Sequence, residues 1–463
     1  MPPEDPRPRG ATRATYDPGV AQSAPVVATP AVRGPLGWLA RVSATGDPAT
    51  PFAWALYDLA NTVYSYAIVS YAMGLWAVER LGPADGQLWF GLAAAASVGL
   101  NALVSPVLGA MSDRGGRRLP FLFAFTALCI ASTALIALTT SPLIGLGLFA
   151  VANFAYQAAL IYYDATLPIV ARPDSRGRVS GFGVAVGYLG TLLIAGTILV
   201  LGSGSSPATF LLAAALYAGF SIPIFVVVRE VGTGERFRLR DALAAWHQLG
   251  DSIREARTIP GLGRFLLARF FYTDPVNTVI VVMSVFAVQA IGLTAGQANL
   301  VLLSLTIVAV VASFLWGQLV ERIGPKRTLG LVLGTWCVGL LAAGSVLALP
   351  TFLLGGILLG AGLGGVWTSD RVLLLRLVPL ERAGQYFGLY GLVGKASAVT
   401  GPVLYGAIVA TLLPRIGDAA YQVGIASFLG LIVVGYALLR GVPEGSADPR
   451  PAAAEGPAAA EAS

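Results

Sequence analysis

Long apolar runs recur along almost the whole of this chain, and they constrain its fold more than any other feature. Runs of about 18 or more apolar residues, each long enough to cross a hydrocarbon core about 30 Å thick, follow one another from residue 51 to residue 441. Only 12% of the 463 residues are charged, whereas a soluble domain carries about 25%. The chain is therefore expected to be an all-α membrane protein.

The apolar runs predict twelve transmembrane helices in two groups of six. The expected spans are 52–79, 87–111, 118–140, 143–170, 178–202, 207–229, 263–291, 296–320, 327–349, 351–378, 384–412 and 419–440. They form an N-terminal bundle over 51–229 and a C-terminal bundle over 263–441. Residues 1–50 and 442–463, rich in Ala and Pro, are expected to be disordered cytoplasmic tails. In the linker 230–262, apolar residues recur at three- and four-residue steps among arginines. This pattern fits either an amphipathic helix on the membrane surface or an ordinary solvated linker helix.

Basic residues are unequally divided between the two sides of the predicted bundle. The connections after the second, fourth, eighth and tenth spans contain Arg114, Arg117, Arg118, Arg172, Arg176, Arg178, Arg322, Lys326, Arg327, Arg376 and Arg382. The opposite connections contain only Arg80 and Arg415. Because basic loops stay in the cytoplasm, both termini are expected there. The excess of Arg over Lys and the lack of a targeting peptide fit a bacterial plasma membrane. The net charge of +6 then reflects topology, and no nucleic-acid partner is expected.

Shared patterns in the two groups of six indicate an internal duplication. DLANTV (Asp58 to Val63) opens the first half and DPVNTV (Asp274 to Val279) opens the second. Each pairs an acid with an amide three residues on, Asn61 and Asn277, and residues three apart share a helix face. Gly177, Gly181 and Gly187 recur as Gly384, Gly388 and Gly394, each 207 positions later by subtraction. Halves with an even number of helices insert in the same orientation, so the two bundles are expected to be parallel repeats.

A further repeat lies in the predicted loops 2–3 and 8–9. GAMSDRGGRR begins at Gly109 and contains Asp113, Arg114, Arg117 and Arg118, while GQLVERIGPKR begins at Gly317 and contains Glu321 and Arg322. The first stretch resembles the loop 2–3 signature of the major facilitator superfamily, and the second is similar to a weaker copy of it. The resemblance covers residues 51–441. It implies a cytoplasmic gate in which the Asp and Arg of the loop pair across helices in one state.

Four other motifs carry a narrower resemblance. They are WALYDLANT (Trp54 to Thr62), VSGFGVAVGYLG (Val179 to Gly190), RFFYTDPVNT (Arg269 to Thr278) and FGLYGLVGKASAVTGP (Phe387 to Pro402). These motifs resemble the vacuole-effluxer branch of the superfamily, known from a fungal autophagy-related exporter of vacuolar amino acids. The resemblance implies export of amino acids or similar small polar solutes. Asp164 stands where the branch has a neutral amide, so the resemblance assigns it no role.

Six charged residues within the apolar segments predict a polar path through the bundle. They are Asp58, Asp164, Asp274, Asp370, Arg371 and Lys395. A charged side chain at mid-bilayer costs about 2.5–3.5 kcal/mol, so six facing lipid would cost more than a typical folding free energy. We expect a hydrated central cavity. The resemblance to the superfamily, in which the first helix of each half lines the cavity, implies that Asp58 and Asp274 face each other across it. Each acid would bind a proton, another cation or a substrate amine. The alternative is a structural hydrogen bond to a neighbouring backbone or Tyr hydroxyl.

Several charged residues of the second half need a partner or access to water. Asp370 and Arg371 are adjacent and point about 100° apart around a helix, so they need not pair with each other. Lys395 needs an anionic partner, which is either a substrate group or Asp370. Arg269 and Arg376 lie near cytoplasmic helix ends, where their side chains are expected to reach water. The predicted substrate or coupling-ion site therefore consists of Asp58, Asn61, Asp274, Asn277, Asp370, Arg371 and Lys395.

Catalytic chemistry is not indicated. The sole histidine, His247, lies in the linker, and Cys129 and Cys337 lie in apolar runs without metal-ligand spacing. No enzyme activity, cofactor or metal is expected. The predicted function is secondary active transport of a small polar solute by a monomer embedded in lipid, through alternating access. Proton coupling and amino-acid export are the working hypotheses. Sugars or other small metabolites are the alternative cargo, and a non-transporting receptor or scaffold is the alternative function.

Overall fold

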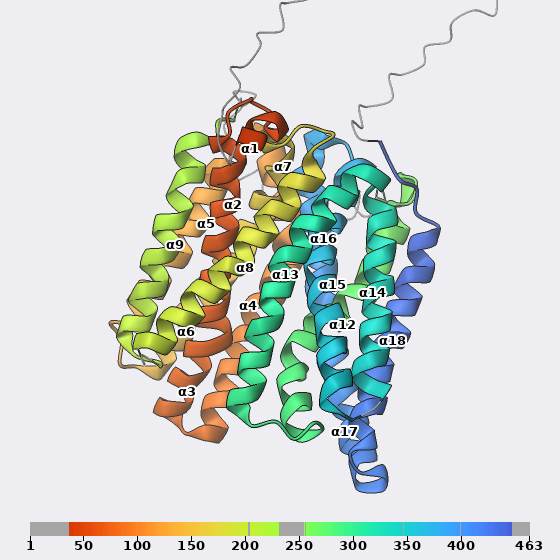
Figure 1. The fold of residues 1–463 in the computed structure, drawn as a ribbon. Helices are drawn as coiled ribbons and strands as arrows, with labels where there is room; N and C mark the ends of the chain where they lie inside the picture. Colours follow the sequence, from red (N-terminus) through yellow and green to blue (C-terminus); the bar gives the residue numbers. More distant parts are fainter. Residues whose placement is uncertain are drawn as a thin grey trace, which may run out of the picture.

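The computed structural model describes residues 37–201, 204–230, 254, 256–345, 347–398 and 400–446, which are almost entirely α-helical (Figure 1). The long helices of the first half are α4 (Pro83–Gly115), α5 (Leu119–Ile136), α6 (Pro142–Ala165), α8 (Arg176–Leu201) and α9 (Pro207–Val227). Those of the second half are α12 (Leu262–Gln289), α13 (Ala295–Ile323), α14 (Pro325–Ser345), α15 (Leu349–Leu377) and α18 (Ala419–Arg440). Several begin with a proline in the first turn, where its missing N–H costs no helical hydrogen bond. The prediction of an all-α membrane fold is confirmed.

Two of the predicted spans are interrupted. The span 52–79 consists of α2 (Ala49–Tyr64), a π-helix (Ser65–Ala72) and α3 (Met73–Leu81). The span 384–412 consists of α16 (Ala383–Ser397) and α17 (Thr400–Ile416). Among the described residues, ten helical segments are long and apolar enough to cross a membrane, and 52–79 and 263–291 are not among them. The number of twelve spans stays a prediction.

Helices of each half pack mainly on one another. In the first half α2 packs against α8 and α9, and α5 packs against α6; in the second half α14 packs against α15 and α18, and α12 packs against α18. The halves meet mainly where α4 packs on α16 and α8 packs on α13 (Figure 1), and α8 also contacts α15 and α6 contacts α16. The division into bundles at 51–229 and 263–441 stays a prediction, and the cavity described below lies between residues of both halves.

Glycines of the predicted repeat lie where the two halves meet. A Cβ on Gly317 of α13 would lie 2.7 Å from the carbonyl oxygen of Gly177 in α8. A Cβ on Gly388 of α16 would lie 2.6 Å from the Cα of Pro106 in α4. Any larger side chain would push these helices apart. Gly177, Gly317 and Gly388 therefore let the two halves approach closely at these points.

The predicted disorder of residues 1–50 is wrong for its last part. Gly37 to Val42 form the short helix α1, and the amide of Ala44 donates to the carbonyl of Val170 over 2.9 Å. Trp38 packs edge-on against Phe182 of the first half and Phe314 of the second. The apolar side chains of this segment give it a surface to bury, which a polar tail lacks. Residues 1–36 lie outside the described part of the chain.

The predicted disorder of residues 442–463 is also wrong at its start. Val442 is buried, and the amide of Ser446 donates to the carbonyl of Arg376 over 3.1 Å. Residues 447–463 lie outside the described part of the chain. So does the apolar pattern of the 230–262 linker up to residue 253, and the two interpretations of that linker stay open.

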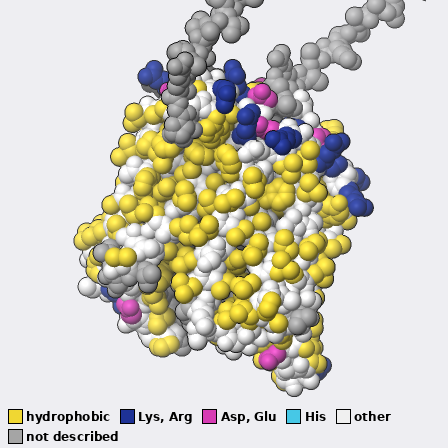
Figure 2. Space-filling model, viewed as in Figure 1, with side chains coloured by type: hydrophobic (Ala, Val, Ile, Leu, Met, Phe, Trp, Pro, Cys, Tyr) yellow, Lys and Arg dark blue, Asp and Glu magenta, His cyan; other side chains and the backbone are white. Residues whose placement is uncertain are grey.

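The outer surface fits a protein surrounded by lipid. Figure 2 shows hydrophobic side chains over the sides of the molecule, with Lys and Arg gathered at the end where α1 lies in Figure 1. Large apolar side chains such as Leu103, Leu138 and Val226 are well exposed. An exposed apolar surface of this extent requires an apolar environment. We call the basic end of the helices the α1 end.

Candidate functional site

A cavity of about 510 Å³ lies between the two halves. This volume is within the range of about 300–1,000 Å³ typical of small-molecule sites. Its wall consists of charged side chains, aromatic side chains and glycines, and both halves contribute to it. The lining includes Asp58, Thr62, Ser65, Tyr156, Gln157, Tyr163, Asp164, Tyr188, Arg269, Thr273, Asn277, Trp367, Arg371, Tyr390, Gly391, Gly394 and Lys395. The predicted residues Asp58, Asn277, Arg371 and Lys395 are thus brought together.

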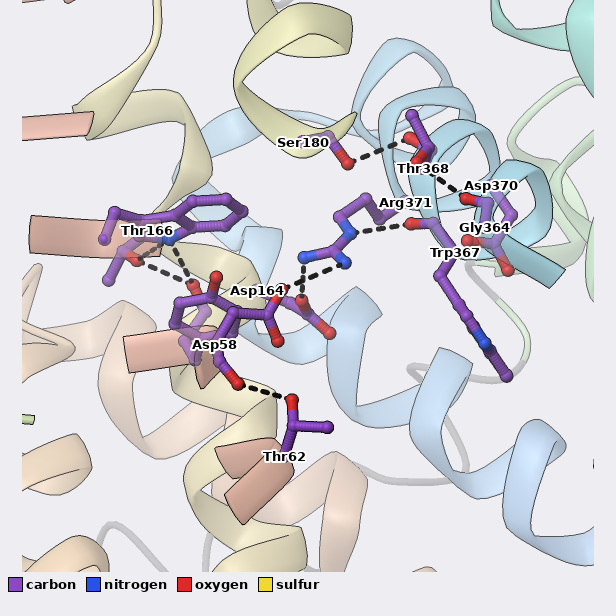
Figure 3. A network of polar contacts seen from close by, with 12 residues as sticks. Asp58, Thr62, Asp164, Thr166, Ser180, Gly364, Trp367, Thr368, Asp370 and Arg371 are labelled. Carbon is purple, nitrogen blue, oxygen red and sulfur yellow. Dashed lines mark hydrogen bonds and ion pairs between the residues drawn. The ribbon is translucent and has the colours of Figure 1, made fainter. Parts of the chain in front are cut away.

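Arg371 of α15 connects the halves at the cavity wall. Its Nε donates to the carbonyl of Trp367 over 2.8 Å, which holds the guanidinium group in place. One terminal nitrogen donates to Asp164 Oδ1 over 3.0 Å, and the other lies 3.9 Å from Asp58 Oδ2 (Figure 3). Both acids belong to the first half, so one cation of the second half is shared between two carboxylates across the interface.

Asp58 of α2 is incompletely paired. Its Oδ2 is buried and has no hydrogen-bond partner among the described residues, since Arg371 is too far for one. Gly187 of α8 makes room for the carboxyl group, because a Cβ there would lie 3.2 Å from Asp58 Cγ. A buried carboxylate oxygen without a donor costs free energy unless it gains a proton or a cationic partner. The geometry therefore leaves Asp58 ready to bind one.

Arg269 and Asp370 form a second ion pair beside the cavity. Both are buried, and Tyr390 donates its hydroxyl to Asp370 Oδ1 over 2.8 Å. The guanidinium of Arg269 also lies 3.3 Å from the centre of the Tyr390 ring, as in a cation–π contact. The expectation that Arg269 reaches water is therefore wrong: a buried carboxylate and a ring face replace its hydration. As expected, Asp370 and Arg371 point in different directions (Figure 3).

Lys395 of α16 bonds to neutral oxygens of α4. Its ammonium donates to Asn101 Oδ1 and, over 3.3 Å, to Ser105 Oγ. The side-chain amide of Asn101 donates in turn to the carbonyl of Phe154 over 3.0 Å, which orients its oxygen toward Lys395. Of the two partners that the sequence left open for Lys395, Asp370 is excluded, because Arg269 and Tyr390 bond to it.

Besides Asp370, which lies beside the cavity, two predicted site residues do not line it. Asn61 is buried and accepts a hydrogen bond of 2.9 Å from the Tyr217 hydroxyl within the first half. Asp274 accepts the amide of Gly401 over 2.7 Å at the start of α17. Asp274 therefore caps the second piece of an interrupted helix, and it does not face Asp58 across a cavity. The prediction of two facing acids is wrong.

The predicted gate residues of the first half join the two halves at the α1 end. Asp113 accepts the amides of Gly384 and Gln385, at 2.9 and 2.7 Å, and lies 3.3 Å from Arg118. Gly109 packs directly on the backbone of Gly384. These bonds hold the end of α4 against the start of α16 and anchor a carboxylate at a helix N-terminus, where the dipole favours it.

The second copy of the gate makes fewer contacts. Glu321 of α13 accepts the amide of Arg178 over 2.9 Å and forms an ion pair with its side chain. Gly317 packs beside Gly177, as described above. Arg117 and Arg322 are exposed, and the side chain of Arg114 lies outside the described atoms.

Sequence reasoning missed two acids that support the gate loops. Glu230, just after α9, accepts the amides of Arg118 and Leu119 at 2.8 and 2.7 Å. Glu444, just after α18, accepts the amide of Lys326 over 3.1 Å. In each half, then, an acid following the sixth segment caps the helix that follows the gate loop. An acid shortly after the last apolar run of each half is the pattern that would have revealed them.

The fold is that of the major facilitator superfamily of transporters. The human organic anion transporter MFSD10 (TETRAN) superposes with a TM-score of 0.69 at 17% identity, over 88% of this chain and all of that one. The proton:xylose symporter XylE superposes with a TM-score of 0.67 at 14% identity, over 86% of this chain and 96% of that one.

Within that superfamily the family is defined by sequence. The model described as "Vacuole effluxer Atg22 like" matches residues 90–447, and the chain belongs to this family. It is 28% identical over 415 residues to the uncharacterized MFS-type transporter YxiO of Bacillus subtilis (strain 168), covering 85% of this chain and 94% of that protein. It is 24% identical over 307 residues to autophagy-related protein 22 of Coccidioides immitis (strain RS), covering 58% of this chain and 49% of that protein. The resemblance drawn from the motifs is confirmed: the protein is a multi-pass membrane transporter and not an enzyme.

Proposed function

We propose that the protein is a secondary active transporter that moves a small polar solute by alternating access to the central cavity. The observation that carries the proposal is the position of Arg371, on the second half, between Asp164 and Asp58 of the first. Breaking a buried ion pair by removing one partner costs about 3–5 kcal/mol. The halves can therefore separate at this point only when a bound solute or proton takes over the freed charges.

Asp58 is the proposed coupling group. Its unpaired oxygen and its position at the cavity support this role. A proton on Asp58 removes its attraction for Arg371 and leaves the guanidinium to Asp164 alone. A substrate ammonium would have the same effect. Loading of the cavity and loosening of the interface would then be one event.

The proposed solute is small and polar, and export is the proposed direction. The cavity volume and its charged lining support the first part, and the family description of a vacuole effluxer supports the second. Amino acids are the leading candidates, with sugars or other small metabolites as the alternative. We further propose a monomer in a bacterial plasma membrane with both termini in the cytoplasm. The basic α1 end supports the proposed orientation.

Transport in proteoliposomes tests this proposal. Thermal-shift screening of purified protein against amino acids and sugars first identifies a solute, because a ligand stabilises the native state by mass action. A pH gradient should then drive accumulation of that solute by the wild type. Asp58→Asn should abolish the accumulation, while the control Asp85→Asn, at an exposed site in the first turn of α4, should not. Full accumulation by Asp58→Asn would exclude Asp58 as the coupling group.

A further inference from the structure

Lys395 differs from the two arginines at the cavity in what its charge contacts. Arg371 and Arg269 are each paired with carboxylates, whereas the hydrogen bonds of Lys395 in the described structure go to the neutral Asn101 and Ser105. An ammonium group has three N–H donors, so one remains available. A partly buried ammonium that contacts only neutral groups gains most from an anionic partner.

Space for such a partner exists beside the ammonium. Gly391 and Gly394 both line the cavity, and Gly391, four residues before Lys395, lies on the same face of α16 as the ammonium side chain. A Cβ on Gly391 would lie 3.6 Å from Lys395 Nζ, and a Cβ on Gly394 would lie 3.1 Å from an Arg269 terminal nitrogen. Two cationic side chains therefore flank a strip of helix without side chains. We call Gly391, Gly394, Lys395 and Arg269 the glycine cradle.

The charges around the cavity decide which anion fits. Asp58, Asp164 and Asp370 balance Arg269, Arg371 and Lys395, so the ionised site is neutral as a whole. A ligand that adds net charge to a low-dielectric site pays a desolvation cost that nothing there compensates. A single carboxylate avoids this cost if it enters with one positive charge. A phosphate, with a charge of about −1.5 to −2, does not.

We propose that the glycine cradle binds the carboxylate of a monocarboxylate solute. The solute enters either as a zwitterion, whose ammonium reaches Asp58, or as an anion together with a proton on Asp58. Lys395 donates the charge-assisted hydrogen bond, and the missing side chains at Gly391 and Gly394 let the carboxylate reach it. This assignment names the substrate class of the proposed transporter and rests on that proposal for its physiological meaning.

Binding to purified protein tests the cradle separately from transport. Calorimetry compares alanine, leucine and phenylalanine with their carboxamides, and propionate with propionamide; inorganic phosphate serves as the competing anion. We expect at least one carboxylate to bind roughly tenfold or more tightly than its amide, the value of a charge-assisted hydrogen bond. Equal binding within every pair, or tighter binding of phosphate than of any carboxylate, would overturn the assignment.

Substitutions at Gly391 and Lys395 test whether the carboxylate binds at the glycine cradle. Gly391→Ala places a methyl group at ordinary van der Waals distance from its protein neighbours, so the fold is kept while the cradle is filled. Lys395→Gln removes the positive charge. If that variant does not fold, Lys395→Arg, which keeps the charge but changes the shape of the donor group, replaces it. Gly391→Ala and Lys395→Gln should weaken carboxylate binding about tenfold and leave amide binding unchanged. The control Gly406→Ala, where a Cβ has no neighbour within 4 Å, should bind like the wild type. Wild-type carboxylate binding by Gly391→Ala would overturn the cradle.

The two proposals fail in different ways. Carboxylate binding that depends on Gly391 and Lys395, without accumulation in proteoliposomes, would refute transport and leave the cradle standing. Accumulation of a solute with no carboxylate preference would refute the cradle and leave transport standing.

Discussion

The two copies of the acid–amide motif present different members to the cavity: the acid in the first half and the amide in the second. On α2, Asp58 lines the cavity, while Asn61 turns into the core of the first half toward Tyr217. On α12, the amide Asn277 lines the cavity, while Asp274 turns to the start of α17. Residues three apart on a helix differ by about 60° in direction. A modest rotation of one helix relative to its repeat therefore exchanges which member of the pair meets the cavity.

The two halves therefore bring different chemistry to the cavity. The first half contributes the carboxylates of Asp58 and Asp164 to the cavity, and the second contributes the cations of Arg269, Arg371 and Lys395. Opposite charges on the facing halves attract each other across the interface, as Arg371 does with Asp164 and Asp58. The contact of Arg371 with Asp164 and Asp58 therefore joins unlike charges that come from different halves.

The largest expected effect comes from removing the cation that both acids share. Arg371→Gln leaves Asp164 and Asp58 without their guanidinium and should lower the free energy of unfolding by about 3–5 kcal/mol, with loss of transport. Thermal unfolding in detergent and proteoliposome uptake measure the two effects. Adding Asp164→Asn to Arg371→Gln should recover much of the stability without recovering transport. Wild-type stability in Arg371→Gln alone would contradict the shared ion pair.

Asp58 and Asp274 should respond differently to the same substitution. Asp58→Asn should abolish pH-driven accumulation, because the amide cannot take up a proton, and should change stability by less than about 1 kcal/mol. Asp274→Asn should keep accumulation within a few-fold of the wild type, because its side chain caps α17 away from the cavity. Uptake assays on matched amounts of the two variants measure this difference. Equal loss of transport in the two variants would restore the symmetric site that the repeat predicts.

Sequence reasoning reached the all-α membrane fold because each apolar run predicts a helix locally. The gate residues came from the resemblance to the loop 2–3 signature of the superfamily, and Asp113 and Glu321 each accept a backbone amide from the other half. Sequence reasoning failed where the direction of a side chain depends on the rotation of its helix, as for Asn61 and Asp274. It also failed for Arg269, since only the tertiary structure brings Asp370 and the Tyr390 ring to it.

The two halves also differ at the α1 end, where we expect substitutions in the gate loops to cost less stability than Arg371→Gln. Asp113 of the first half accepts two backbone amides and contacts Arg118, all in a buried setting. Asp113→Ala should therefore cost about 1.5–3 kcal/mol, the value of hydrogen bonds to a charged group. Hydrogen exchange followed by mass spectrometry should show faster exchange at the start of α16, which contains Gly384 and Gln385. Unchanged exchange there would mean that Asp113 does not hold the halves together.

The smallest effect is expected at the corresponding acid of the second half. Glu321 accepts one backbone amide, and its ion-pair partner Arg178 is 40% exposed, so water screens much of their attraction. Exposed ion pairs contribute about 0–1 kcal/mol, and Glu321 loses one amide hydrogen bond where Asp113 loses two, so Glu321→Ala should cost less than Asp113→Ala. The same exchange measurement, read at the start of α8, should show a smaller acceleration than Asp113→Ala produces at the start of α16. A larger acceleration at α8 would reverse the order of the two gates. It would then be the second-half loop, the weaker match to the superfamily signature, that keeps the α1 end closed.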